Sequence, residues 1–445
     1  MTGSSKTARI LAAAFAVSSV ICVAPGVLAH EAGPPDSLTY LYEVEGVKVI
    51  QRRVLTSELV AVNLYLLGGA RQITESTAGI EPLLLRASER GTRNYPGPAT
   101  LEAQARTGSR MVVSALRDWT IFGFRGLAEE FDSTWAVFAD RLMYPTLDSA
   151  AVEATRERML AAVRSGMNDP DVAVWSLARS LAFSGHAYAV DVDGTEESLG
   201  GITIEDVRTY LNDQIVSSRM LLVVVGNVSR EVVEEAVRRT IGQLPRGDYV
   251  WELPPTWEAD DPVVEVQHRN LPASYIVGYF GGPKASSDDY LALTVATALL
   301  SAIVFNEVRD EGLSYDAGAS LIESGAAGGA VYVSTAKPKE SMEIINDVIE
   351  LIQQARVSWT LLTDWTKGWI INFYLDHETN AQQADFLARS YLYRGELQTP
   401  KDRVDELRGL SPYDVRNAAT RYMKNIQYAY LGDITDAPRE LMREH

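Results

Sequence analysis

Few residues of this 445-residue chain have the side chains and spacing needed to bind a metal ion. The internal histidines His186, His268 and His377 are far apart, and none has a second histidine one helical turn away. A zinc site needs several imidazole, thiolate or carboxylate ligands that converge on one point. His377 and Glu378 are adjacent ligand types at the end of a predicted helix, and we interpret them as a solvated surface pair. The histidine spacing alone therefore indicates no metal centre.

The stretch Ala78–Thr92 is predicted to form one amphipathic helix that begins at Gly79. Two predicted strands, Val47–Arg53 and Leu59–Gly68, precede it. The apolar residues that recur at helical spacing are Ile80, Leu83, Leu84 and Ala87. Periodicity alone is typical of a helix buried against a sheet.

The order of these elements resembles the M16 (pitrilysin/insulinase) metallopeptidases, whose helix reads A-G-x-x-H-x-x-E-H-x-x-x-x-G-T. The residues that match this frame without a gap are Ala78, Gly79, Gly91 and Thr92. The two histidine positions hold Pro82 and Arg86, and the glutamate position holds Leu85. Proline and leucine side chains have no lone pair for zinc, and an arginine places positive charge where the cation would sit. The resemblance therefore implies a zinc helix without its ligands, and we expect no metal in this chain.

The family's third zinc ligand is a glutamate on a later helix. Its usual spacing from Arg86 leads to Ala162, and the position one heptad earlier holds Thr155. Glu153 and Glu157 are close in sequence, but helical residues one or two apart do not share a face. The expected ligand positions on both helices thus all lack metal-binding side chains. An error in the alignment of one helix does not readily explain the absence on both.

Three further fragments carry the resemblance over nearly the whole chain. They are His186–Thr203, with the G-T-E-E-S-L run, Val223–Val233, and Asn306–Ser320, with its R and G-L-x-Y residues. The resemblance implies an α+β fold of two homologous M16-type domains, each a mixed, mostly antiparallel sheet covered by helices.

Arg309 and Tyr315 match an arginine and a tyrosine that face the zinc cleft in the family. The resemblance implies that they hold the substrate backbone and stabilise the developing oxyanion. A guanidinium and a phenol are donors suited to a charge that grows in the transition state. The pair is six residues apart, one fewer than usual in the family. The alternative is an arginine at a helix end, where its charge is favoured anyway, followed by a strand tyrosine.

The predicted strand Met111–Leu116 corresponds to an edge strand that pairs with the substrate in active family members. The expected substrate-binding residues are Val112, Val113, Ser114 and Ala115, and they lack the family's polar asparagine. Backbone pairing does not require that side chain, so a peptide could still add as a further strand. The alternative is an ordinary hairpin, because many exposed edges have no ligand.

The chain is long enough to require at least two domains. We predict a signal peptide over residues 1–29, an N-terminal domain over 30–246, a linker over 247–262 and a C-terminal domain over 263–440. Local echoes between the halves, such as Leu64–Gly69 with Ile276–Gly282, indicate a duplication.

The leader has a basic start, an apolar run and a small-residue cleavage site before His30, which indicates export to the periplasm. Its removal takes Lys6 and Arg9 with it and lowers the net charge from −18 to −20. Such a chain is a poor candidate for binding nucleic acid or an anionic membrane. We expect no other stretch to be long and apolar enough to span a bilayer.

These observations favour a catalytically silent subunit of a periplasmic M16 peptidase. It would form a heterodimer with a partner that carries H-x-x-E-H and its zinc, and would act on a peptide or unfolded polypeptide. The alternative is a non-proteolytic scaffold or peptide-binding homodimer, as in the core subunits of the respiratory bc1 complex. A zinc peptidase in its own right is disfavoured, because no three ligands are visible.

Overall fold

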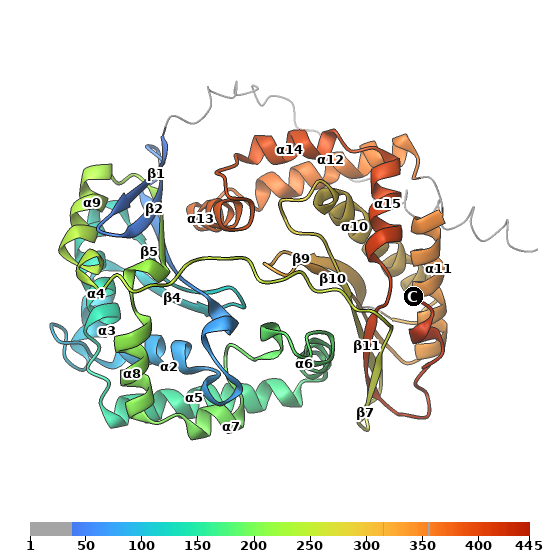
Figure 1. Ribbon diagram of the computed structural model, residues 1–445, viewed down its shortest axis with the longest axis horizontal. Coiled ribbons are helices and arrows are strands. Elements are labelled where there is room, and N and C mark those ends of the chain that lie inside the picture. The colour runs from blue at the N-terminus through green and yellow to red at the C-terminus, as the bar shows by residue number, and fades with distance from the viewer. Residues whose placement is uncertain (1–37, 315, 355–356) are drawn as a thin grey trace, which may run out of the picture.

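The computed structural model describes residues 38–314, 316–354 and 357–445. The predicted leader over 1–29 and Tyr315 lie outside these residues. Two mixed β-sheets, each covered by helices, stand side by side as two lobes (Figure 1). This arrangement confirms the predicted α+β class.

The N-terminal lobe contains a six-stranded sheet in the order β1-β2-β6-β3-β5-β4. Its strands are β1 (Thr39–Val44), β2 (Val47–Arg53), β3 (Leu59–Leu67), β4 (Arg110–Ala115), β5 (Trp119–Leu127) and β6 (Met220–Gly226). The helices of this half of the chain are α2 (Ile80–Ala87), α3 (Ala99–Thr107), α4 (Phe131–Met143), α5 (Ser149–Asn168), α6 (Pro170–Ala182), α7 (Glu196–Gly201), α8 (Ile204–Gln214) and α9 (Arg230–Arg239).

The C-terminal lobe contains a five-stranded sheet in the order β7-β11-β8-β10-β9. Its strands are β7 (Val264–His268), β8 (Ser274–Gly281), β9 (Asp316–Ile322), β10 (Gly328–Thr335) and β11 (Gln427–Gly432). The helices of this half are α10 (Asp289–Asp310), α11 (Pro338–Gln354), α12 (Trp359–Leu375), α13 (Asn380–Arg389), α14 (Pro400–Arg408) and α15 (Pro412–Tyr422).

The helix predicted over Ala78–Thr92 is shorter than expected. α2 ends at Ala87, and a 3-10 turn over Ser88–Arg90 follows. Gly91 then adopts a φ of 152°, where a Cβ atom would lie 2.7 Å from the backbone nitrogen of Gly97. Only glycine tolerates that conformation and that close approach, so the helix cannot continue through Gly91.

Strand β1 was not predicted. It forms a hairpin with β2 through Glu45 and Gly46, whose φ angles are 49° and 84°. Two consecutive positive φ angles define the type I′ turn that matches the twist of a two-stranded hairpin. The Glu-Gly pair between two apolar alternating runs was the available sequence signal.

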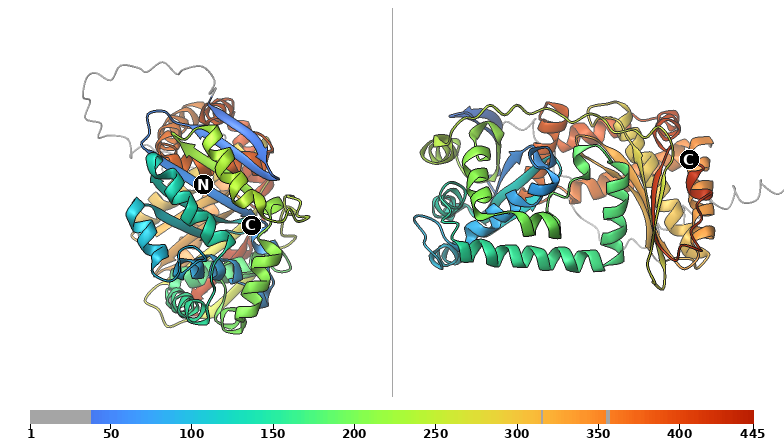
Figure 2. Two further views of the ribbon diagram at one scale, coloured as in Figure 1. Left: turned by 90° about the vertical axis from the view of Figure 1, so that its left-hand side faces the viewer. Right: turned by 60° about the horizontal axis from the view of Figure 1, so that its bottom comes forward.

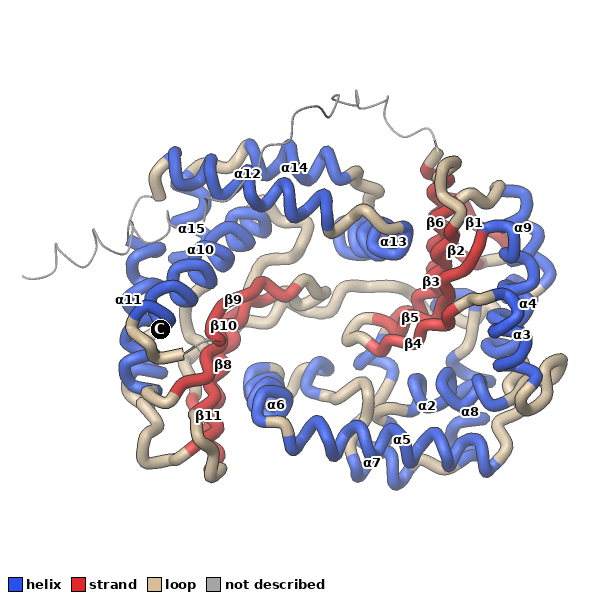
Figure 3. Tube along the Cα trace, turned by 180° about the vertical axis from the view of Figure 1, so that it is seen from behind, coloured by secondary structure: helices blue, strands red, loops and turns tan. Residues whose placement is uncertain are grey.

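Each lobe covers one face of the other lobe's sheet with a helix. α5 carries the chain across the molecule, and α6 then packs on β8 and β11 of the C-terminal sheet (Figure 2, right). In return, α13 packs on β3 and β6 of the N-terminal sheet (Figure 3). Two apolar clusters therefore contain residues from both halves of the chain. The exchange buries the second apolar face of each sheet.

The Asp118 carboxylate joins the two lobes. It lies in the β4–β5 turn, is buried, and accepts hydrogen bonds from the Tyr188 hydroxyl (2.5 Å), the Tyr393 hydroxyl (2.8 Å) and the Gly325 backbone N–H (2.9 Å). Tyr393 and Gly325 belong to the C-terminal half. Burial, reinforced by the Asp118 charge, raises the pKa of Tyr188 and Tyr393, so both phenols stay protonated and able to donate.

The predicted linker has no helix or strand but is in contact with both halves. The Trp251 indole N–H donates to the backbone oxygen of Leu392 at 3.1 Å. The Arg71 guanidinium donates to the backbone oxygen of Glu252 at 2.6 Å. Tyr249, Trp251 and Leu253 also pack against the apolar cluster between the lobes. The segment is thus part of the packed structure.

The expectation that no further stretch is long and apolar enough to span a bilayer was wrong for helix α10. This helix has 22 residues, and its most apolar 18-residue window has a mean hydropathy of 1.8, which satisfies the length and composition of a membrane span. However, 61% of its most apolar window is buried inside the protein. Its apolar residues form the centre of the C-terminal core. Burial of this kind is typical of a core helix.

We predict that Tyr393→Phe weakens the contact between the lobes. The substitution keeps the ring and removes one hydrogen bond to a charged acceptor, so the free energy of unfolding should fall by about 1.5–3 kcal/mol. Urea unfolding followed by tryptophan fluorescence measures the change. Tyr391→Phe, in the same turn but half-buried, is the control. Equal stability of the two variants would show that the Asp118 contact contributes nothing.

Candidate functional site

The positions that the resemblance matches to zinc ligands lie on two contacting helices, α2 and α5. Pro82 and Leu85 are buried, and Ala162 is exposed. The Arg86 guanidinium forms an ion pair with Asp193 at 3.0 Å. The buried Thr155 hydroxyl donates to the Ala151 backbone oxygen of its own helix. This set offers no imidazole or carboxylate toward a common point, so it does not fit zinc.

A buried ion pair lies in the first turn of α2. The Glu81 carboxylate accepts from the Arg219 guanidinium (2.9 Å) and the Tyr210 hydroxyl (2.8 Å), and both charged side chains are at most 4% exposed. Arg219 also donates to the Leu67 backbone oxygen at the end of β3. These contacts fix α2 to α8 and to the sheet. The pair could not be predicted from the sequence, because the partners are 138 residues apart and no local pattern around Glu81 indicates that it is buried.

Strand β4 lies at the edge of its sheet and pairs only with β5 among the described strands. The Leu116 N–H donates to the Trp119 backbone oxygen, so Leu116 and Trp119 form a hydrogen-bonded pair. From this pair, hydrogen-bonded and non-hydrogen-bonded pairs alternate along β4 and β5. The N–H and C=O groups of Val112 and Ser114 therefore point toward β5. Those of Met111, Val113 and Ala115 point to the open edge. Of the four predicted substrate-binding residues, only Val113 and Ala115 thus present backbone groups to the open edge. Helix α2 is in contact with this strand.

Arg309 is exposed in the last turn of α10, and its guanidinium lies 5.8 Å from the ring of Phe305 in the same helix. α10 belongs to the C-terminal lobe, whereas α2 and α5 lie in the N-terminal lobe (Figure 1). The structure therefore does not bring Arg309 to the α2 helix within one chain. Because Tyr315 lies outside the described residues, the pairing of Arg309 with Tyr315 stays a prediction.

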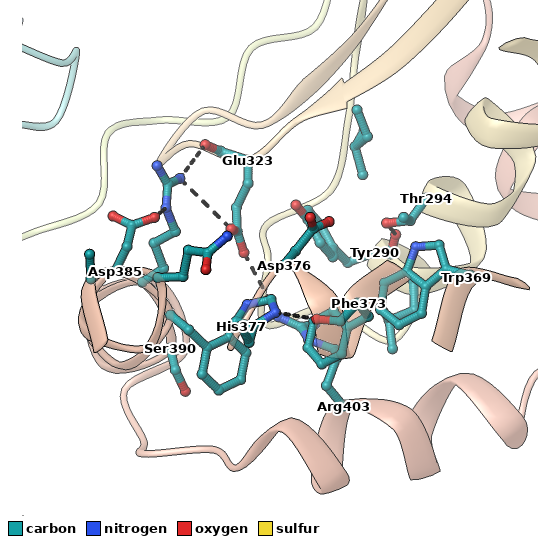
Figure 4. Close-up of a pocket in the computed structure, with 16 residues that line it drawn as sticks. Tyr290, Thr294, Glu323, Trp369, Phe373, Asp376, His377, Asp385, Ser390 and Arg403 are labelled. Carbon is teal, nitrogen blue, oxygen red and sulfur yellow. Dashed lines mark hydrogen bonds and ion pairs between the residues drawn. The ribbon is translucent and has the colours of Figure 1, made fainter. Parts of the chain in front are cut away.

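A hollow of about 410 Å³ in the C-terminal lobe contains His377 (Figure 4). His377 is half-buried and packs against the rings of Phe373 and Phe386, so the interpretation of His377 as a solvated surface residue was wrong. Its Nδ1 atom lies 2.5 Å from the Phe373 backbone oxygen. Glu378, next in the chain, is exposed as expected.

Charged groups in the same hollow compensate one another. The Glu323 carboxylate lies 3.8 Å from both the Arg389 and the Arg403 guanidinium, and Arg389 also pairs with Asp385 at 2.6 Å. Burial raises the pKa of Glu323. The part of the chain that the structure describes contains no group of three His, Cys, Asp or Glu side chains that could hold a metal ion. We interpret this cluster as support for the end of β9.

The fold is that of a two-lobed α+β protein with one mixed sheet in each lobe. Two family models match the chain: "Insulinase (Peptidase family M16)" over residues 48–192 and "Peptidase M16 inactive domain" over residues 201–362. The chain belongs to the M16 family.

Curated relatives differ in their described roles. The mouse cytochrome b-c1 complex subunit 1 is 22% identical over 301 residues, covering 67% of this chain and 58% of that protein. The Blastocladiella emersonii mitochondrial-processing peptidase subunit beta is 21% identical over 240 residues, covering 54% and 51%. An uncharacterized zinc protease of Bacillus subtilis, YmxG, is 21% identical over 274 residues, covering 61% and 66%. The matches thus span about half to two thirds of these relatives.

Solved structures share the whole architecture. The peptidase M16 inactive domain from Pseudomonas fluorescens superposes with a TM-score of 0.80 at 17% identity, covering 89% of this chain and 98% of that one. A protease from Helicobacter pylori gives a TM-score of 0.81 at 17% identity, covering 88% and 99%. At this identity the likeness establishes the fold alone.

We predict that Glu81→Gln destabilises the protein strongly. The change leaves the Arg219 charge buried without its partner, which should cost about 3–5 kcal/mol in the free energy of unfolding. Chemical denaturation measures it, with the exposed Glu75→Gln as the control. A loss below 0.5 kcal/mol, roughly the size of a surface effect, would contradict the role assigned to the pair.

Proposed function

We propose that this chain is a catalytically silent subunit of an M16 zinc peptidase. The observation that carries the proposal is the contrast between two neighbouring features of the N-terminal lobe. The helix pair α2–α5 carries no imidazole or carboxylate at the positions expected to bind zinc, while the adjacent strand β4 has an open edge. A chain of this kind can bind an extended peptide but cannot activate a water molecule through zinc.

The missing chemistry would come from a second M16 chain that carries H-x-x-E-H and holds the zinc. Arg309 and Tyr315 of the present chain would then face the partner's cleft. There a guanidinium and a phenol would stabilise the charge that develops on the scissile carbonyl oxygen. The exposure of Arg309 on the end of α10 is compatible with a role outside its own chain. The predicted leader supports a periplasmic location for this heterodimer.

A second candidate is a non-proteolytic scaffold or peptide-binding homodimer of the same fold. It is favoured by the similarity to a protein named as a subunit of the cytochrome b-c1 complex. Native mass spectrometry of the chain from its own cells distinguishes the two. A complex with an H-x-x-E-H chain supports the first proposal, and a homodimer without a peptidase supports the second.

We predict that the chain alone cleaves nothing and that mixing it with the H-x-x-E-H chain of the same cell yields peptidase activity. Tyr315→Phe or Arg309→Ala should lower kcat of the mixture by about 100-fold, as expected for the loss of one transition-state donor. Cleavage of a quenched fluorescent peptide measures the rate. Arg439→Ala, an exposed arginine elsewhere in the C-terminal half, should leave it unchanged. Full activity of the Tyr315→Phe mixture would refute the assigned role.

We also predict that Val113→Pro weakens peptide binding by about tenfold. The N–H of Val113 points to the open edge, so proline removes a donor to an added strand without breaking the β4–β5 ladder. Fluorescence anisotropy with a labelled extended peptide measures Kd. Val113→Ala retains the N–H and is the matched control. Equal Kd values for the two variants would show that peptides bind elsewhere.

A further inference from the structure

Two arginines lie directly opposite each other at the start of β4. The register pairs Arg110 of β4 with Arg125 of β5. Met111 and Val113 pack against the N-terminal core on one face of the sheet, so the alternation of side chains puts Arg110 on the opposite face, beside Arg125. Like charges directly opposite each other destabilise a strand pair. An acceptor between or beside them would remove that cost.

The arginines border a hollow of about 570 Å³ between the lobes. Apolar residues of the N-terminal sheet, such as Leu59, Ala61 and Leu127, form one wall, and the start of α13 forms the other. Arg125 donates to the backbone oxygens of Val62 (3.2 Å) and Phe124 (2.9 Å), so carbonyl groups are its hydrogen-bond partners.

In the part of the chain that the structure describes, the acids near this hollow form no ion pair with Arg110 or Arg125, although they lie nearby. Glu378 lies in its lining, and Asp385 acts on Arg125 from α13. Among the described residues, no carboxylate lies within 4.0 Å of a guanidinium nitrogen of Arg110 or Arg125. The lining therefore carries a net positive charge in a chain whose overall charge is −18. An anionic group is the complementary ligand for such a place.

The hydrogen-bond alternation fixes where an added strand would meet this charge. The N–H and C=O of Arg110 point toward β5, so a peptide residue opposite Arg110 forms a pair without hydrogen bonds. In such pairs the Cα atoms are close and the side chains of the two strands lie beside each other. The side chain of that peptide residue would lie on the same face as Arg110 and Arg125. The peptide side chain would lie next to Arg110, in line with Arg110 and Arg125 across the strands, and would enter the hollow.

We propose that the Arg110–Arg125 hollow is a specificity subsite for an acidic side chain, aspartate or glutamate, of a peptide bound along β4. The inference rests on the proposed peptide-binding function and adds the substrate class to it. The acidic residue occupies the strand position opposite Arg110, where its carboxylate compensates the like-charge pair. A lysine at the same position places a third positive charge in the row and is disfavoured.

The test uses the full chain and labelled octapeptides of threonine and valine, capped at both ends, in which a single aspartate or a single lysine is moved through each position. Fluorescence anisotropy at low salt should show one position at which aspartate binds about fivefold more tightly than lysine. Arg110→Glu should reverse this preference at that position. Arg106→Glu, the same charge change on the exposed face of α3, should leave it intact.

The outcomes separate the two proposals. Binding of all peptides with equal affinity, or a preference that survives Arg110→Glu, overturns the acidic subsite and leaves the peptide-binding edge in place. If Arg106→Glu abolishes the preference for aspartate as much as Arg110→Glu does, the preference comes from the general charge of the lobe, and the subsite is also overturned. No binding by any peptide overturns the proposed peptide-binding function and the subsite with it.

Discussion

The structure depends on the reciprocal burial of each sheet beneath a helix of the other half. Without α6, the C-terminal sheet would expose an apolar face, and without α13 the N-terminal sheet would do the same. The hydrophobic effect therefore opposes separation of the lobes. Asp118 adds directional hydrogen bonds across the same boundary. Because Asp118 lies in the turn that ends β4, the contact that joins the lobes also fixes the strand proposed to bind peptide.

Helix α2 carries leucines rather than metal ligands on its buried side. Leu83, Leu84 and Leu85 pack in the N-terminal core. The Glu81–Arg219 pair anchors the first turn, where a buried charge is tolerated only because its partner and the Tyr210 hydroxyl satisfy it. The helix thus supports strand β4 alongside it.

Local patterns predicted most elements, whereas long-range contacts escaped prediction. Strand Val47–Arg53 has the expected bounds, and the strand expected over Met111–Leu116 begins and ends one residue earlier, at Arg110–Ala115, because alternation and turn residues mark both. Amphipathicity cannot tell which sheet a helix covers, so the packing of α6 and α13 on the opposite lobe's sheet could not be predicted from the sequence. Asp118 looks like an ordinary turn residue, since its partners are 70 to 275 residues away. The side of β4 on which Arg110 lies follows only once the register with β5 is known.

We propose that this chain has the fold of an M16 peptidase and an open β4 edge for a peptide, and that the zinc is bound by a partner chain. Metal analysis tests it most directly, on the chain purified alone and on the complex captured with it from its own cells. The account predicts no zinc above the buffer blank in the chain alone, and zinc in the captured complex in proportion to the H-x-x-E-H chain. Stoichiometric zinc in the chain alone, lost on chelation together with peptidase activity, would contradict it.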